Sequence, residues 1–170
     1  LGEFTSDRII GTVQVIDSAR DRTLAGVSFL GAVYAAGGVG VNARVQLWNP
    51  AATGRRAIVK QIKVGSTANS PFNVYVATAA EANAYASPAN PVNKLLGGAA
   101  SVMEHRYDNI VALPAGAIVL SGNVIANDET QWYRFAEPVI LPPGYGLLVR
   151  NVTVNQSITA CFDFYEEVNS

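Results

Sequence analysis

Short runs in which apolar and polar residues alternate recur along most of the chain, and clusters of Gly, Pro, Asn and Ser separate them. This period of two is typical of strands that bury one face. Helix signals are poor throughout, so the pattern predicts an antiparallel β-sandwich or barrel. We expect strands at residues 9–16, 44–48, 57–66, 72–78, 101–107, 117–126, 130–141, 146–152 and 157–165.

The last of these strands shows the alternation most clearly. The face predicted for the core holds Ile158, Ala160, Phe162 and Phe164. The opposite face holds Thr159, Cys161, Asp163 and Tyr165. Burying a Phe contributes about 1.5–3 kcal/mol relative to exposure, so Phe162 and Phe164 should fix the register. Upstream, LPPGYG (141–146) contains two prolines that cannot donate to a β-ladder, which predicts a strand boundary.

Two segments depart from this pattern. Residues 78–92 are rich in Ala, but Pro88 and Pro91 allow only a short helix or a turn. Residues 1–43 combine a charged stretch with many small residues that bury little area. We interpret them as an extended arm that packs on the sandwich or on a neighbouring subunit; the alternative is a flexible loop with an isolated strand. The predicted organisation is an all-β, antiparallel two-sheet sandwich of jelly-roll type at residues 44–170, preceded by this arm.

Composition and charge narrow the classes of function. Apolar residues make up 49% of the chain and charged residues 15%, which is below the usual quarter, so the chain either folds compactly or covers much surface in contacts. The net charge is −1 and no basic run exceeds Arg55-Arg56, which argues against nucleic-acid binding. The most apolar stretch, residues 25–41, is short and broken by five glycines, so we expect neither a membrane span nor a signal peptide.

Candidate nucleophiles and bases are few. His105 is the only histidine, so a Ser-His or Cys-His site would need it, with Ser101 or Cys161 as the nucleophile. The G-x-S-x-G motif of a nucleophile elbow is missing. We therefore expect His105 to be an ordinary surface or packed residue, and Cys161 to be a buried, inert thiol.

Carboxylate pairs and metal ligands are equally sparse. Glu166 and Glu167 are adjacent, so in a strand they point to opposite faces, and we expect both to be solvated charges at a strand end. Glu129 and Glu137 form another pair, which only coordinates can judge. The NDE sequence at 127–129 offers oxygen ligands but lacks a calcium-loop pattern, so a turn is expected. We predict no catalytic, cofactor-binding or metal site, and no enzymatic activity.

Two surface features remain. Asn151 and Asn155 match the acceptor pattern for N-glycosylation, which is short and frequent by chance. Trp48, Trp132 and Tyr133 could stack on sugar rings, although aromatic residues on a sandwich more often anchor a core or an interface.

The turn motifs carry a resemblance to a known group of proteins. The sequence VQLWNPAATGRRAIVKQIKVGS (45–66) is followed by PFNVYVATA (71–79) and, towards the end, by PVILPPGYGLLVRNVTVNQSITACFDFYEE (138–167). This order resembles small all-β structural proteins of tailed bacteriophages, namely head decoration (cement) proteins and related tail or fibre modules. The likeness rests on an L-W/F-N-P turn, an L-x-P-G turn and an aromatic-aromatic-Glu ending, and it covers roughly residues 44–167.

The resemblance implies a function and partners. Decoration proteins of this kind imply β-sandwich subunits of the virion that assemble, often as trimers, on the major capsid protein. Tail and fibre relatives imply instead trimers that contact a receptor or a carbohydrate of the host. We expect a capsid decoration protein, with the receptor- or carbohydrate-binding module as the alternative and a small β-fold enzyme as a further rival. No cofactor is implied.

Overall fold

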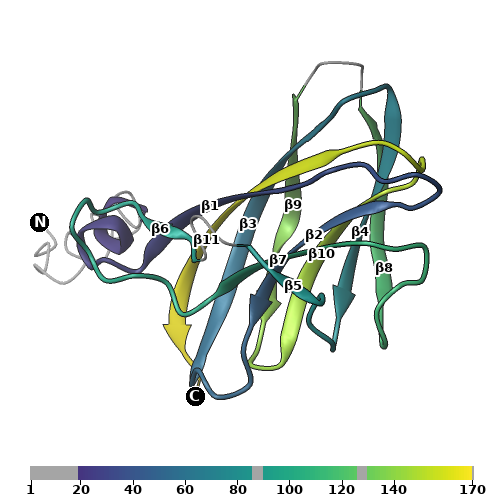
Figure 1. Ribbon diagram of the computed structural model, residues 1–170. Coiled ribbons are helices and arrows are strands. Elements are labelled where there is room, and N and C mark those ends of the chain that lie inside the picture. The colour runs from purple at the N-terminus through teal and green to yellow at the C-terminus, as the bar shows by residue number, and fades with distance from the viewer. Residues whose placement is uncertain (1–18, 86–89, 126–129, 170) are drawn as a thin grey trace, which may run out of the picture.

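The computed structural model describes residues 19–85, 90–125 and 130–169. A helix covers residues 19–24. The strands are β1 (Ser28–Ala35), β2 (Ala43–Asn49), β3 (Arg55–Ser66), β4 (Ser70–Ala77), β5 (Asn83–Ala84), β6 (Val92–Asn93), β7 (Glu104–Asn109), β8 (Ile118–Ile125), β9 (Thr130–Leu141), β10 (Tyr145–Asn151) and β11 (Ile158–Val168). They form two antiparallel sheets that pack against each other, in the orders β6-β1-β11-β3-β9 and β5-β7-β2-β10-β4-β8 (Figure 1).

The connectivity is that of a jelly roll. Strand β6 lies at the edge of one sheet, and β5 and β7 lie at the edge of the other. When these three strands are left out, the two sheets are β1-β11-β3-β9 and β2-β10-β4-β8. The chain passes from one sheet to the other at every connection between these eight strands except the one from β4 to β8. This arrangement confirms the predicted all-β, two-sheet sandwich of jelly-roll type.

The core lies between the two sheets and follows the predicted alternation. Phe162 and Phe164 on β11 are fully buried, and the ring of Phe164 stacks on Phe29 of β1 with ring centroids 5.6 Å apart. The facing sheet contributes Val45, Leu47 and other side chains that are also fully buried. The register expected for residues 158–165 is therefore correct, because a slip by one residue would expose both Phe side chains.

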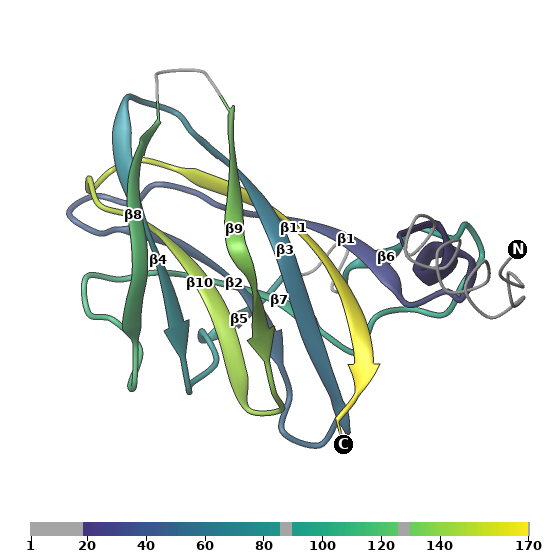
Figure 2. The same cartoon turned by 180° about the vertical axis from the view of Figure 1, so that it is seen from behind.

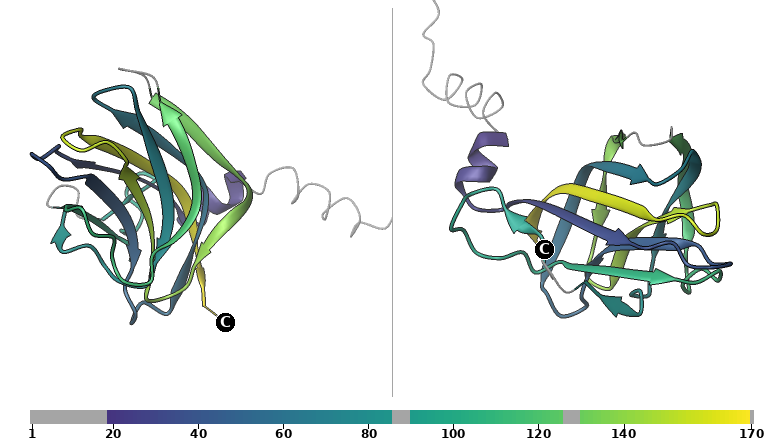
Figure 3. Two further views of the ribbon diagram at one scale, coloured as in Figure 1. Left: turned by 90° about the vertical axis from the view of Figure 1, so that its right-hand side faces the viewer. Right: turned by 45° about the horizontal axis from the view of Figure 1, so that its top comes forward.

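The boundary expected between an arm and the sandwich at residue 44 is wrong for residues 28–43. Strand β1 pairs with β11 over its whole length, from Ser28 opposite Tyr165 to Ala35 opposite Ile158. Small residues are required here, because a Cβ added at Gly31 would collide with the imidazole of His105 from the other sheet. The helix of residues 19–24 lies beside the sandwich (Figure 3). Residues 1–18, including the strand expected at 9–16, lie outside the described residues.

An insertion between β4 and β8, residues 78–117, widens both sheets on the same side. Strand β7 pairs with β2, β5 pairs with β7, and β6 pairs with β1. The segment expected to hold a short helix or turn contains bends and β5 in its described part. Seen from behind, β6 and the helix lie at one side of the sandwich and β8 at the other, with β9 between them (Figure 2).

The turn motifs of the sequence meet at one end of the sandwich. As predicted, LPPGYG separates two strands: the Tyr145 N–H donates to the Pro142 carbonyl (3.2 Å), and Gly144 has a φ of 83°, as a type II turn requires. Asn49 of the LWNP motif links this turn to the turn between β2 and β3. Its side-chain amide donates to the Leu141 carbonyl (2.9 Å) before the first turn and to the Arg55 carbonyl (2.7 Å) after the second. The L-W-N-P and L-x-P-G motifs thus form one packed unit.

Candidate functional site

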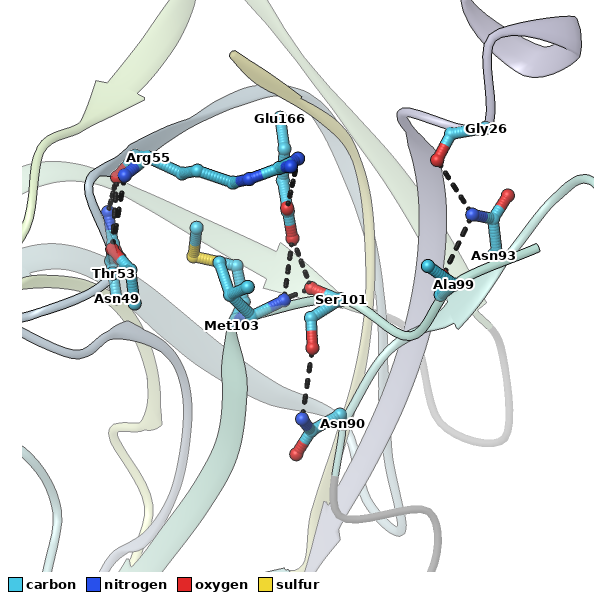
Figure 4. Close-up of polar contacts among 11 residues, drawn as sticks. Gly26, Asn49, Thr53, Arg55, Asn90, Asn93, Ala99, Ser101, Met103 and Glu166 are labelled. Atoms are coloured by element: carbon cyan, nitrogen blue, oxygen red, sulfur yellow. Dashed lines mark hydrogen bonds and ion pairs between the residues drawn. The ribbon is translucent and has the colours of Figure 1, made fainter. Parts of the chain in front are cut away.

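Glu166 is buried, although the sequence analysis expected a solvated charge at the end of a strand. Its side chain is buried on the core face of β11, with 2% of the residue exposed. The Ser101 hydroxyl donates to its Oε1 atom at 2.5 Å (Figure 4), and the Val102 N–H donates to the same atom at 3.0 Å. The Arg55 guanidinium lies 3.5 Å from its other oxygen. The carboxylate therefore holds the segment before β7 across the end of the sandwich.

Glu167 behaves as expected. It lies on the opposite face of β11 and forms an ion pair with Arg56 at 2.9 Å, and both side chains are partly open to solvent. The two adjacent glutamates thus point to opposite faces, as predicted. Glu137 is exposed on β9, whereas Glu129 and the turn expected at 127–129 lie outside the described residues.

The three candidate catalytic residues occupy separate environments. His105 is fully buried on the inner face of β7, where the ring of Tyr85 contacts it edge-on. The Ser101 hydroxyl donates to Glu166 and accepts the Met103 N–H at 3.0 Å (Figure 4). Cys161 lies on the outer face of the opposite sheet. Of the two alternatives that the sequence left open for His105, a surface or a packed residue, the structure shows the packed one.

Cys161 is partly exposed, which corrects the expected buried thiol. It lines a mainly apolar cavity of about 320 Å³ beside Leu30, Val92 and Leu96. Partial burial, and then the charge of Asp163, raise the pKa of the Cys161 thiol against the opposing effect of two lysines. The side chain is therefore protonated at neutral pH.

The aromatic candidates divide between packing and exposure. Tyr133 packs edge-on against Phe135, with ring centroids 5.2 Å apart, next to the core. Trp48 is partly buried. Trp132 is half exposed on the outer face of β9, and the Lys63 ammonium lies 5.7 Å from the centre of its ring.

The two asparagines of the glycosylation pattern also differ. Asn151 is buried, and its side chain forms hydrogen bonds with the hydroxyls of Ser66 and Ser70, so the folded protein does not present it for modification. Asn155 is exposed, and its side-chain oxygen accepts a hydrogen bond from the Gly40 N–H at 2.7 Å.

A buried ion cluster lies on the outer face of the six-stranded sheet, where residues 79–82 and 110–114 cover β2. The Arg44 guanidinium lies 2.6 Å from the Glu81 carboxylate and 3.4 Å from that of Asp108, and it donates to the Ala112 carbonyl. Burial raises the pKa of Glu81; Arg44 opposes this shift and Asp108 adds to it. The cluster holds both ends of the insertion against the sheet. Nothing in the sequence pattern signalled that Arg44 and Glu81 would be buried.

A groove crosses the outer face of the five-stranded sheet. Four residues on neighbouring strands form one cross-strand row, in the order Tyr34, Thr159, Gly65 and Thr130. Together with residues 66, 67 and 157, they line a cavity of about 320 Å³. Because Gly65 has no side chain, the middle of the row is hollow.

An apolar segment of the other sheet runs from the outer face over β2 and β10 to the edge strand β8. Between residues 110 and 120, which lead into β8, the exposed large apolar side chains are Ile110, Val111, Leu113, Ile118, Val119 and Leu120. β8 is an edge strand, and its register with β4 shifts at Leu120 in a β-bulge. The bulge turns neighbouring apolar side chains of one strand towards solvent.

Among the residues that the structure describes, no group of three or more His, Cys, Asp or Glu side chains is arranged to hold a metal ion. Within the same residues, no helix has the length and apolar character needed to cross a membrane. Comparison with known proteins gave no matching family model, no matching curated protein and no matching solved structure.

Proposed function

We propose that the protein is a structural subunit of a phage virion, a decoration protein that binds and stabilises the head. The observation that carries the proposal is the apolar segment at residues 110–120. Six large apolar side chains are exposed there: three lie on the edge strand β8, and three lie on the segment that crosses the outer face of the sheet before it. Exposed apolar surface beside an unpaired edge is typical of a site that another protein covers.

The charge of the chain favours the same proposal. With a net charge of −1, neighbouring copies repel one another little. No charged residue occurs between residues 110 and 120, so covering the apolar segment desolvates no ionised side chain there. Each Å² of apolar surface removed from water contributes about 25 cal/mol.

The fold alone does not choose between a capsid role and others. Jelly rolls build both viral capsid domains and lectins, so function must be argued from sites. The resemblance of the turn motifs to phage decoration proteins supports the capsid role. We further propose that the subunit forms a homotrimer, since several weak contacts to the major capsid protein then act together. Binding only to assembled heads stabilises those heads by mass action.

The test uses heads of the virus that encodes this chain, prepared without the protein. Purified protein should co-sediment with these heads and raise the temperature at which they release DNA. The double change Ile118→Lys and Val119→Lys should abolish co-sedimentation, because it places two charges in the contact.

The matched control is Leu96→Lys. Leu96 is 92% exposed but lies outside the apolar segment, so this variant should bind as wild type does. Failure of the wild-type protein to bind heads, or equal binding by the double variant, would contradict the proposal.

A further inference from the structure

We infer that the groove on the outer face of the five-stranded sheet is a binding site for a neutral oligosaccharide. This inference goes beyond the proposed role on the head and does not depend on it.

The shape of the groove comes from one cross-strand row. Tyr34 on β1 lies opposite Thr159 on β11, Thr159 lies opposite Gly65 on β3, and Gly65 lies opposite Thr130 on β9. A Cβ added at Gly65 would lie 3.0 Å from the Thr130 methyl group. Any side chain at position 65 would therefore fill the floor between Tyr34 and Thr130.

The Tyr34 ring is exposed and held in place. It is 43% exposed, and its hydroxyl donates to the Ser157 hydroxyl oxygen at 3.1 Å. The Gly37 N–H donates to the same Ser157 oxygen at 2.9 Å, which fixes this rim of the groove. The face of this ring can pack against the C–H face of a sugar ring that lies in the groove. Because the ring is already held in place, it loses little conformational entropy on binding.

The lining selects for a neutral ligand that carries hydroxyl groups. Six of the seven residues that line the cavity carry a side-chain hydroxyl, and none of the seven is charged; the six are Tyr34, Ser66, Thr67, Thr130, Ser157 and Thr159. Among the described residues, the hydroxyls of Thr130 and Thr159 have no hydrogen-bond partner, so they are available to a ligand. A hydroxyl both donates and accepts, as a sugar hydroxyl requires. A phosphate or carboxylate inside the cavity would lose water without meeting a lining cation. Lys63 lies outside the cavity, opposite Trp132 in the neighbouring row, with its ammonium 5.7 Å from the centre of that ring.

The extent of the surface favours several sugar units. The row spans three interstrand intervals, or about 14 Å. Trp132 lies two residues after Thr130 on the same face of β9 and is half exposed, so a second aromatic ring stands beside the far end of the row. The cavity volume of about 320 Å³ is at the lower end of the range for ligand sites.

The experiment measures saturation-transfer NMR signals from defined probes with the purified full chain. The probes are maltotriose, cellotriose, mannotriose and tri-N-acetylchitotriose as neutral sugars, and sialyllactose as a charged one. At least one neutral probe should give a signal, and sialyllactose should bind at least tenfold more weakly.

Two variants then locate the site. Tyr34→Ala removes the exposed ring and Gly65→Val fills the floor, and each should weaken binding at least tenfold. Tyr145→Ala, which removes a tyrosine of similar exposure from the other sheet, should change affinity less than twofold. The inference is overturned if no neutral probe binds, if sialyllactose binds as well as they do, or if the two groove variants bind like wild type while still folded by circular dichroism.

Discussion

Glu166→Ala should be among the most destabilising single substitutions in this protein. The buried carboxylate accepts hydrogen bonds from the Ser101 hydroxyl and the Val102 N–H. A hydrogen bond to a charged group contributes about 1.5–3 kcal/mol, so losing both should cost about 3–6 kcal/mol. The Arg55 contact, at 3.5 Å and with Arg55 itself well exposed, adds little. Since each kcal/mol shifts the Tm of a chain this size by about 2–4 °C, the expected loss is roughly 6–24 °C.

The neighbouring glutamate supplies the control. Glu167→Ala breaks a partly exposed pair with Arg56 and should cost only about 0.2–1 kcal/mol. Glu166→Gln keeps an oxygen acceptor but loses the charge, which roughly halves the strength of each bond, so it should lose about half as much as the alanine variant. Urea unfolding followed by circular dichroism measures all three. Equal losses for the alanine variants of Glu166 and Glu167 would refute the structural role of Glu166.

Three further predictions concern the core, an ionised group and the thiol. Phe162→Ala should cost about 3–5 kcal/mol in urea unfolding, whereas Asp163→Ala, which loses contacts to Lys94 and Gln61, should cost about 1–2 kcal/mol; the reverse order would show that the register is wrong. The folded state raises the pKa of Glu81 above its ordinary 4.5, so it binds this proton more tightly than the unfolded state does. The stability of wild type relative to Glu81→Gln should therefore fall as pH rises from 4.5 through the folded pKa, and a rise would contradict the assignment. Because its pKa is raised, Cys161 should react with a thiol reagent more slowly than free cysteine at pH 8, with a rate still increasing above pH 9; a plateau below pH 9 would be inconsistent with this.

The sequence predicted the strands whose alternation is carried by large side chains. Phe162 and Phe164 fix β11, and the two prolines after Leu141 end β9. β1 was assigned to an arm because its segment is rich in small residues that bury little area, and only the packing of His105 against Gly31 explains why a glycine is needed there. The same alternation placed Glu166 on the face of Phe162 and Phe164, but the usual exposure of glutamate suggested solvent instead.

The groove could be predicted only in part. Alternation placed Thr159 on the outer face, and the outward position of Thr130 follows from the same period. The row itself depends on which strands are neighbours and in which register, and Tyr34, Gly65, Thr130 and Thr159 are far apart in the sequence. Periodicity gives the face that a side chain occupies but not the residue beside it, so the row required the structure.

The position of β11 in the middle of its sheet has a consequence for biosynthesis. β11 lies between β1 and β3, with residue 28 paired to residue 165, so β1 and β3 lack their shared central partner until β11 is translated. Before then, β1 can pair in this sheet only with the short β6, and β3 only with β9. Ribosomes add about 5–20 residues per second, so Phe29, Val59 and their neighbours stay accessible to chaperones for several seconds or longer. The five-stranded sheet is therefore completed only after β11 leaves the ribosome, when β11 joins β1 to β3 in a late, non-local step of folding.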